Sequence, residues 1–211
     1  MLFRSLLLAM SLASWVVIIL KSLNLFTAQK QAARIEAFWH SPNVAGGVQV
    51  LGNEENNPFR TLALRGEEAL AHLKTSTSKP ELRQELDTSD LVTRSLQNTI
   101  DDATAELQSG MAILASVGST SPFVGLFGTV WGIYHALMQI GMAGQATIDK
   151  VAGPIGEALI MTALGLAVAI PAVLGYNALV RGNKSVITRM NRFAHDLHAL
   201  LMTGSRLKAK G

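Results

Sequence analysis

The sequence predicts an all-α membrane protein with three transmembrane helices and long helical extensions outside the bilayer. Of its 211 residues, 49% are hydrophobic and only 16% are charged, whereas about 25% of the residues in a soluble domain carry a charge. The charges avoid three runs, at residues 5–20, 107–148 and 158–180. With its apolar flanks, each run supplies the ~20 residues with which a helix crosses a bilayer while pairing its own backbone groups.

The first apolar run allows two interpretations. Arg4, an apolar stretch and Ser11-Leu12-Ala13 resemble a secretory signal peptide. However, the apolar stretch continues from Trp15 to Leu20 before it meets a lysine. We therefore expect a retained transmembrane helix over residues 1–26.

The second and third runs predict a helical hairpin. The run from 107 is too long for one crossing, so residues 107–140 are expected to hold the end of an outer helix and the second transmembrane helix. A short loop with a turn at Gly141–Gly144 is expected over 141–153. The third transmembrane helix is expected over 154–180, with Pro154 in its first turn, where a missing N–H costs nothing.

Basic residues near the three spans predict the orientation. One side carries Lys21, Lys30, Arg34, Arg181, Lys184, Arg189 and Arg192, and the other side carries only Arg4 and Lys150. By the positive-inside rule, the N-terminus and the 141–153 loop lie outside. Residues 27–106 and 181–211 then lie in the cytoplasm.

The 27–106 segment is expected to be helical between breaks. The breaks are expected at Ser41-Pro42-Asn43, Gly46-Gly47, Asn53–Pro58 and Thr75–Pro80. Helices are then expected over 59–74 and 81–110. An apolar stripe follows the second of these at three- and four-residue steps, through Leu96, Ile100, Ala103, Leu107, Met111 and Leu114. Because the stripe meets no breaker, this helix is expected to run continuously into the second span.

The 181–211 tail is predicted to continue the third span as an amphipathic helix. Its apolar arc is Val186, Met190, Phe193, Leu197 and Leu201, and its basic arc is Arg181, Lys184, Arg189 and Arg192. The basic arc is expected to be solvated and to contact anionic lipids. No aromatic residues interleave with it, which argues against nucleic acid. His195 and His198 have no third ligand nearby, so we interpret them as surface histidines.

Small residues line the second and third spans. Ser121 and Gly125 form one small-xxx-small pair, and Gly128 and Gly132 form another. In the third span one face carries Ala158, Thr162, Gly165 and Ala169. Such faces allow two helices to approach closely, so we expect packing at these positions.

Three residues within the spans have side chains that can do chemistry. Thr129 and Thr162 either bond the carbonyl one turn earlier in their own helix or line a polar path. Glu157 either complements the dipole at the start of the third helix or is a functional acid at membrane depth. From the residues alone these alternatives remain open. The sequence contains no cysteine, no phosphate-binding loop and no metal or nucleophile motif, so we expect neither an enzyme nor a cofactor.

These same residues carry a resemblance to a known family. Ser121-Pro-Phe-Val-Gly-Leu-Phe-Gly-Thr-Val-Trp-Gly-Ile133 and the run from Gly156 to Asn177 resemble the MotA/TolQ/ExbB proton-channel family, most closely its ExbB branch. Asp149–Pro154 and Asn191–His198 add to the likeness. Gly153-Pro154 reverses the Pro-Gly of many relatives, and the segment before the first helix is shorter than is usual in the family.

The resemblance implies a motor subunit in the inner membrane of a Gram-negative cell. It implies a homopentamer around transmembrane helices of an ExbD-like one-span protein, with proton flow that energises a TonB-like protein and thereby iron–siderophore uptake. Thr129 and Thr162 correspond to the pore-lining threonines of the family, and Glu157 corresponds to its pore carboxylate. The alternatives are a TolQ-like subunit of the Tol-Pal motor and a passive membrane scaffold.

Overall fold

The computed structural model describes residues 2–54, 56–76, 82–143 and 148–204. All regular elements in these ranges are helices, as predicted. In chain order they are α1 (Leu2–Ala33), α2 (Ile35–Trp39), α3 (Val44–Leu51), α4 (Pro58–Ser76), α5 (Leu82–Gln108), α6 (Met111–Ala143) and α7 (Ile148–Thr203). Within these described ranges, three helices are long and apolar enough to cross a membrane.

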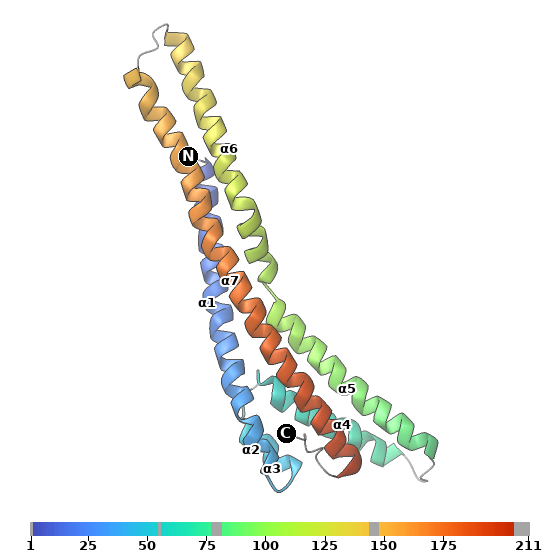
Figure 1. Cartoon of the computed structure of the whole chain (residues 1–211). Helices are drawn as coiled ribbons and strands as arrows, with labels where there is room; N and C mark the ends of the chain where they lie inside the picture. The colour runs from blue at the N-terminus through green and yellow to red at the C-terminus, as the bar shows by residue number, and fades with distance from the viewer. Residues whose placement is uncertain (1, 55, 77–81, 144–147, 205–211) are drawn as a thin grey trace. The chain divides into compact units, whose positions relative to one another are not determined.

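The chain forms two compact units, each built from separate stretches of sequence. The first, which we call the span unit, comprises Met1–Ser22 and Ser109–Val180. The second, which we call the core unit, comprises Leu23–Gln108 and Arg181–Gly211. Helices α1 and α7 contribute to both units (Figure 1).

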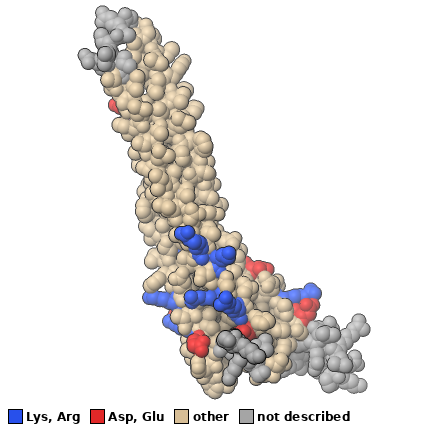
Figure 2. All heavy atoms as spheres, in the orientation of Figure 1, with Lys and Arg blue, Asp and Glu red and all other residues tan. Residues whose placement is uncertain are grey.

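The span unit packs α6 and α7 side by side, with α1 against them. A Cβ on Gly118 of α6 would lie 2.6 Å from Cγ2 of Val173 on α7, and one on Gly175 of α7 would lie 2.7 Å from the Ile18 side chain of α1. Many large apolar side chains of α1, α6 and α7 are exposed on the surface of the span unit. The face of this unit that Figure 2 shows carries almost no Lys, Arg, Asp or Glu. An apolar outer surface of this kind suits a bilayer.

The expected continuous helix from residue 81 into the second span is wrong. Helix α5 ends at Gln108 and α6 begins at Met111, with a turn at Ser109-Gly110. Gly110 has φ +76°, a left-handed conformation that glycine adopts without steric cost and that ends a helix. The apolar stripe crosses this turn unbroken: Leu96 and Ile100 are buried in the core unit and Leu114 is buried in the span unit.

Helix α7 is a single helix of 56 residues, so the prediction that the tail continues the third span is confirmed. It begins at Ile148 rather than near residue 154, and Pro154 lies inside it instead of in its first turn. The only helix breaker among residues 148–153 is Gly153, which a helix tolerates. The helix therefore extends back beyond Pro154 to Ile148. Part of the expected turn, Gly144, lies outside the described residues.

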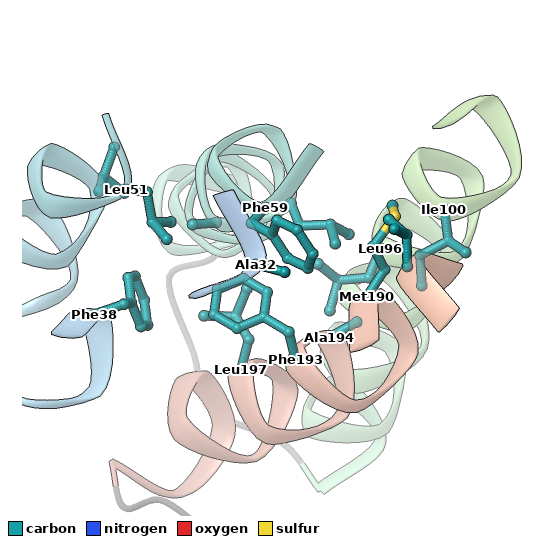
Figure 3. Packing of buried hydrophobic residues seen from close by; sticks show 14 of the residues in the cluster. Ala32, Phe38, Leu51, Phe59, Leu96, Ile100, Met190, Phe193, Ala194 and Leu197 are labelled. Carbon is teal, nitrogen blue, oxygen red and sulfur yellow. The ribbon is translucent and has the colours of Figure 1, made fainter. Parts of the chain in front are cut away.

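The core unit is organised around aromatic rings. Phe193 of α7 is buried, and its ring centroid lies 5.1 Å from that of Phe38 and 6.0 Å from that of Phe59, both in edge-to-face geometry (Figure 3). Edge-to-face pairs add to the stabilisation from apolar burial. The predicted faces of the tail are confirmed: the apolar arc packs into this cluster and the basic residues of the opposite arc are exposed.

Gly46-Gly47 was expected to break the chain, but both glycines lie within α3. Asn43 caps this helix, with its side-chain oxygen accepting from the Gly46 N–H at 2.7 Å. A Cβ on Gly47 would lie 2.6 Å from the Phe38 ring. The glycine is therefore needed for close approach to the aromatic cluster rather than for a turn.

A cluster of polar side chains connects the ends of α1 and α3 with the start of α4 through hydrogen bonds. Arg34 donates to the Leu51 carbonyl at 3.0 Å and to the Glu54 carboxylate at 3.1 Å. Asn57 donates to the same Leu51 carbonyl at 2.8 Å, and its side-chain oxygen accepts from Phe59 N and Arg60 N at the start of α4. The Arg34 guanidinium, through these hydrogen bonds, lowers the pKa of Glu54 below its ordinary value.

Candidate proton-path site

In the span unit, α6 and α7 approach each other closely enough for their backbone atoms to touch. A Cβ on Gly125 would lie 2.6 Å from the Met161 carbonyl oxygen and 3.0 Å from Cα of Gly165. A Cβ on Gly165 would likewise lie 2.7 Å from the Ser121 carbonyl oxygen. Only residues without a side chain fit on both helices at this level.

The other predicted packing residues lie along the same two helices. Gly132 faces Ala158 of α7, with its Cβ position 2.9 Å from the alanine methyl. Gly128 faces the flexible side chain of Met161 at 3.1 Å. Ala169 is buried. Ser121 is fully buried, and its hydroxyl has no hydrogen-bond partner among the described residues.

Thr129 and Thr162 are brought together one turn from the glycine contact. Their hydroxyl oxygens lie 2.7 Å apart, a strong hydrogen bond between α6 and α7. The Thr129 hydroxyl also lies 2.9 Å from the carbonyl oxygen of Ala158 and 3.1 Å from that of Gly125. Thr129 is buried, whereas Thr162 is half-buried. Gly125 and Ala158 thus provide both the close approach and the acceptors for the pair.

The number of hydrogens limits how this pair can bond. Thr129 has one hydroxyl hydrogen but three acceptors within reach. If it donates to a carbonyl, Thr162 donates to Thr129 and presents only lone pairs outward. If it donates to Thr162 instead, the Thr162 hydrogen points outward and one internal bond is lost, at about 1 kcal/mol. The pair can therefore accept a hydrogen bond from outside or, after both hydroxyls rotate, donate one.

Glu157 lies one residue before Ala158, and its carboxylate is exposed on α7. Its Oε2 atom pairs with Nη2 of Arg4 on α1 at 3.4 Å. Because α7 begins at Ile148, Glu157 is the tenth residue of the helix, and the helix dipole acts only within the first turn. The dipole interpretation of Glu157 is therefore wrong. The sequence marks Arg4 as a lone charge beside an apolar run, but this does not identify it as the partner of Glu157.

The two histidines of the tail differ in their surroundings. His195 is exposed, but His198 is half-buried and its Nε2 atom lies 3.2 Å from the Ser89 hydroxyl of α5. His198 is thus a helix–helix contact within the core unit rather than a surface histidine. Among the described residues, no group of three His, Cys, Asp or Glu side chains is placed to hold a metal ion.

Comparison with known proteins identifies the family of the chain. Residues 56–192 match the model of the MotA/TolQ/ExbB proton channel family, and the chain belongs to that family. It is a multi-pass membrane protein of the inner membrane, in a family of transport and channel proteins rather than of enzymes. The resemblance inferred from residues 121–133 and 156–177 is thereby confirmed.

Two groups of relatives are similar to the chain. The biopolymer transport protein ExbB of Xanthomonas campestris pv. campestris is 45% identical over 96% of this chain and 81% of its own length. The protein of the same name from Neisseria meningitidis is 39% identical over 93% of this chain and 89% of its own length. The Tol-Pal system protein TolQ of Pseudomonas aeruginosa is 44% identical, but over 52% of this chain and 48% of its own length.

Proposed function

We propose that this chain is the proton-conducting subunit of an inner-membrane motor of the ExbB type. In this proposal the proton motive force across the inner membrane drives the motor, which energises a TonB-like protein and thereby nutrient import across the outer membrane. The single observation that carries the proposal is the Thr129–Thr162 hydrogen bond, because it places two reorientable hydroxyls on adjacent apolar helices. Glu157 would supply the titratable group beside them.

The proposal includes partners that the single chain lacks. An ExbD-like one-span protein would place its transmembrane helix and a proton-carrying carboxyl within a homopentamer of this chain. The large apolar side chains exposed on α1, α6 and α7 would then face lipid, neighbouring copies or the partner helix. The exposed Arg181, Lys184, Arg189 and Arg192 of α7 would contact anionic lipid headgroups.

The orientation is also part of the proposal, with the N-terminus periplasmic and residues 27–106 and 181–211 cytoplasmic. The chain has no native cysteine, so single cysteines can be labelled without background. In spheroplasts, a cysteine at the exposed Asn56 should resist an impermeant thiol reagent. A cysteine at Gly141, where a Cβ meets nothing within 4 Å, should react. The reverse pattern would invert the topology.

A TolQ-like role is the alternative within the family, since TolQ proteins are among the relatives. The longer coverage of the ExbB relatives favours the ExbB type. Co-purification decides between them when the chain is tagged in its own host. Recovery of a TonB-like protein supports the first role, whereas recovery of a TolA-like protein with a TolR-like partner supports the second.

Substitutions at the threonine pair and at Glu157 separate a motor from a passive scaffold. Thr129→Val and Thr162→Val keep the side-chain volume but remove the hydroxyl, and Glu157→Gln keeps the shape but removes the titratable group. We expect all three variants to insert and oligomerise but to lose energy-dependent siderophore uptake. Thr→Ser should restore part of the activity because it restores the hydroxyl, whereas Thr→Ala should not.

The same variants can contradict the proposal. Full siderophore uptake in the Thr129→Val, Thr162→Val double variant would show that these two residues serve only in helix packing. Full uptake in Glu157→Gln as well would make the chain a scaffold. Oligomeric state, measured by native mass spectrometry of the complex co-expressed with its partner, shows whether a loss of uptake arises from failed assembly.

A further inference from the structure

Charged side chains are scarce in the described part of the span unit, and two of them form a pair. In the ranges 3–20, 111–142 and 152–180, the charged residues are Arg4 on α1 and Glu157 on α7, one of each sign. They lie 153 positions apart in the sequence. Folding nevertheless places Nη2 of Arg4 3.4 Å from Oε2 of Glu157.

We propose that Arg4 is the counter-ion of Glu157 and also its positioning residue. In this role the Arg4 guanidinium holds the Glu157 carboxylate, the acid of the proposed proton path, beside α1. The inference rests on the proposed function of Glu157 but concerns a different residue on a different helix. A charge in a membrane is tolerated when it is paired with another charge or faces a polar cavity. Arg4 supplies that pairing within the same chain.

The geometry favours a positioning role over a contribution to stability. The arginine and glutamate side chains are 47% and 73% exposed on the single chain, and the pair is longer than a typical hydrogen bond. Such a pair contributes little to the folding of a water-exposed surface. In surroundings of low dielectric constant its effect is larger, because removing either partner leaves the other charge uncompensated.

The other titratable or charged side chains that the structure describes in the span unit have contacts of their own or lie far along the chain. Lys21 donates to the Ser109 hydroxyl at 2.7 Å. On α6, Nδ1 of His135 lies 3.0 Å from the Trp131 carbonyl oxygen, and the ring of Tyr134 packs beside that histidine. Tyr176 lies on α7, more than five turns after Glu157. None of these side chains has an ion pair with Glu157 among the described contacts.

Phe3 supports the placement of Arg4. Its ring packs edge-to-face on Phe127 of α6, with the ring centroids 5.3 Å apart. This contact anchors the first turn of α1 one residue before Arg4. It therefore limits the freedom of the guanidinium, which is what a positioning residue requires.

The test measures proton flux into proteoliposomes that contain the assembled complex of the full chain and its one-span partner. Arg4→Gln should reduce the flux at least about tenfold, because the carboxylate is left without compensation. Arg4→Lys should stay within about twofold of the parent, because a lysine also carries a positive charge. The Arg4→Gln, Glu157→Gln double variant should be no less active than Glu157→Gln alone, because Arg4 acts through Glu157. Leu8→Met, a volume-conserving apolar change at an exposed residue of α1 one turn later, is the control and should leave the flux unchanged.

Two further measurements separate electrostatic positioning from a structural role. Across pH 6 to pH 8, the ratio of Arg4→Gln flux to parent flux should change with pH, whereas a structural defect would scale the flux equally at every pH. The Arg4→Cys, Glu157→Cys double variant in intact membranes should be cross-linked by a flexible bifunctional thiol reagent. The product should have the mass of a monomer, because the pair lies within one chain.

The outcomes distinguish this inference from the proposed function. Full flux in Glu157→Gln would overturn the proposed function. An inactive Glu157→Gln beside a fully active Arg4→Gln would overturn the inference alone. A pH-independent loss shared by Arg4→Gln and Arg4→Lys, or a cross-link formed only between chains, would also overturn it. If Arg4→Gln does not assemble, the Arg4→Lys flux and the cross-link still decide the question.

Discussion

Gly125 of α6 and Gly165 of α7 touch through their backbones: a Cβ on either glycine would lie 3.0 Å from Cα of the other. Two helices approach this closely only where neither carries a side chain. One turn along α6 from this contact, Thr129 reaches both Thr162 and the Ala158 carbonyl. The glycine contact thus sets the separation of the helices at which the threonine pair forms.

Gly125→Ala should therefore disrupt the helix pair, because the new methyl would meet the Met161 carbonyl oxygen at 2.6 Å. Gly128→Ala should be tolerated, since there the methyl meets only the flexible Met161 side chain at 3.1 Å. Gly156→Ala, which meets nothing within 4 Å, should be neutral or stabilising by up to about 1 kcal/mol. Thermal stability and oligomeric state of the detergent-solubilised protein test this order, and equal behaviour of the three variants would contradict it.

Phe193→Ala should destabilise the core unit by about 3–5 kcal/mol, because it empties the centre of the aromatic cluster. The Phe193 ring contacts the rings of Phe38, Trp39 and Phe59. Arg192→Ala, at the exposed neighbouring residue, is the matched control and should change stability by less than about 0.5 kcal/mol. Limited proteolysis of membrane-embedded protein between α1 and α4 reports the difference. Equal protection of the two variants would show that the cluster is not the source of stability.

Asn57→Ala should cost about 1–3 kcal/mol, because it removes a cap and leaves buried backbone groups without partners. The Asn57 side chain is fully buried, bonds the Leu51 carbonyl, and accepts from the first N–H groups of α4. Asn57→Asp keeps the cap acceptor and should lose less. Hydrogen exchange at the start of α4 measures the effect, and unchanged protection in Asn57→Ala would contradict the capping role.

Glu54→Gln should destabilise the core unit at neutral pH, and the difference from the parent should shrink as the pH falls. Arg34 lowers the pKa of Glu54, so the folded state releases the proton more readily than the unfolded state. The stabilisation is then present above the ordinary glutamate pKa of about 4.3 and is lost as the pH falls through the lowered folded value. Denaturant titrations of the parent and the variant at pH 7 and at a series of lower pH values test this, and a difference that does not shrink as the pH falls would contradict it.

The helices and their buried faces could be predicted because they depend on periodicity within one segment. The stripe through Leu96 and Ile100 and the apolar arc of the tail are repeats of three and four residues, which local sequence reveals. The positions at which the helices end are set by single residues, and the effect of each such residue depends on the side chains packed around it. Gly110 adopts a left-handed conformation at a helix end, whereas Gly47 lies inside α3, where the Phe38 ring leaves no room for a side chain. Their local sequence does not distinguish these two cases.

The candidate site was predicted in part. Thr129, Thr162 and Glu157 are singled out by the sequence as polar groups in apolar spans, but the residues alone leave open whether the threonines bond a carbonyl of their own helix or line a polar path. In the structure the Thr129 hydroxyl lies within hydrogen-bond distance of the Gly125 carbonyl of its own helix and of the Thr162 hydroxyl of α7, a contact that the sequence does not predict. The Arg4–Glu157 pair joins two residues 153 positions apart, and no local pattern predicts a contact at that separation without a comparison of related sequences.

The core unit is assembled from two stretches of the chain, residues 23–108 and 181–211, with two candidate membrane spans between them. During synthesis, Phe38 and Phe59 leave the ribosome long before Phe193, so their aromatic faces remain uncovered until both intervening spans have been made. Exposed apolar faces of this kind attract chaperones and proteases. A chain whose second or third span fails to insert cannot deliver Phe193 to its place, so the core unit stays open. The order of the sequence therefore makes completion of the core unit depend on the insertion of both spans.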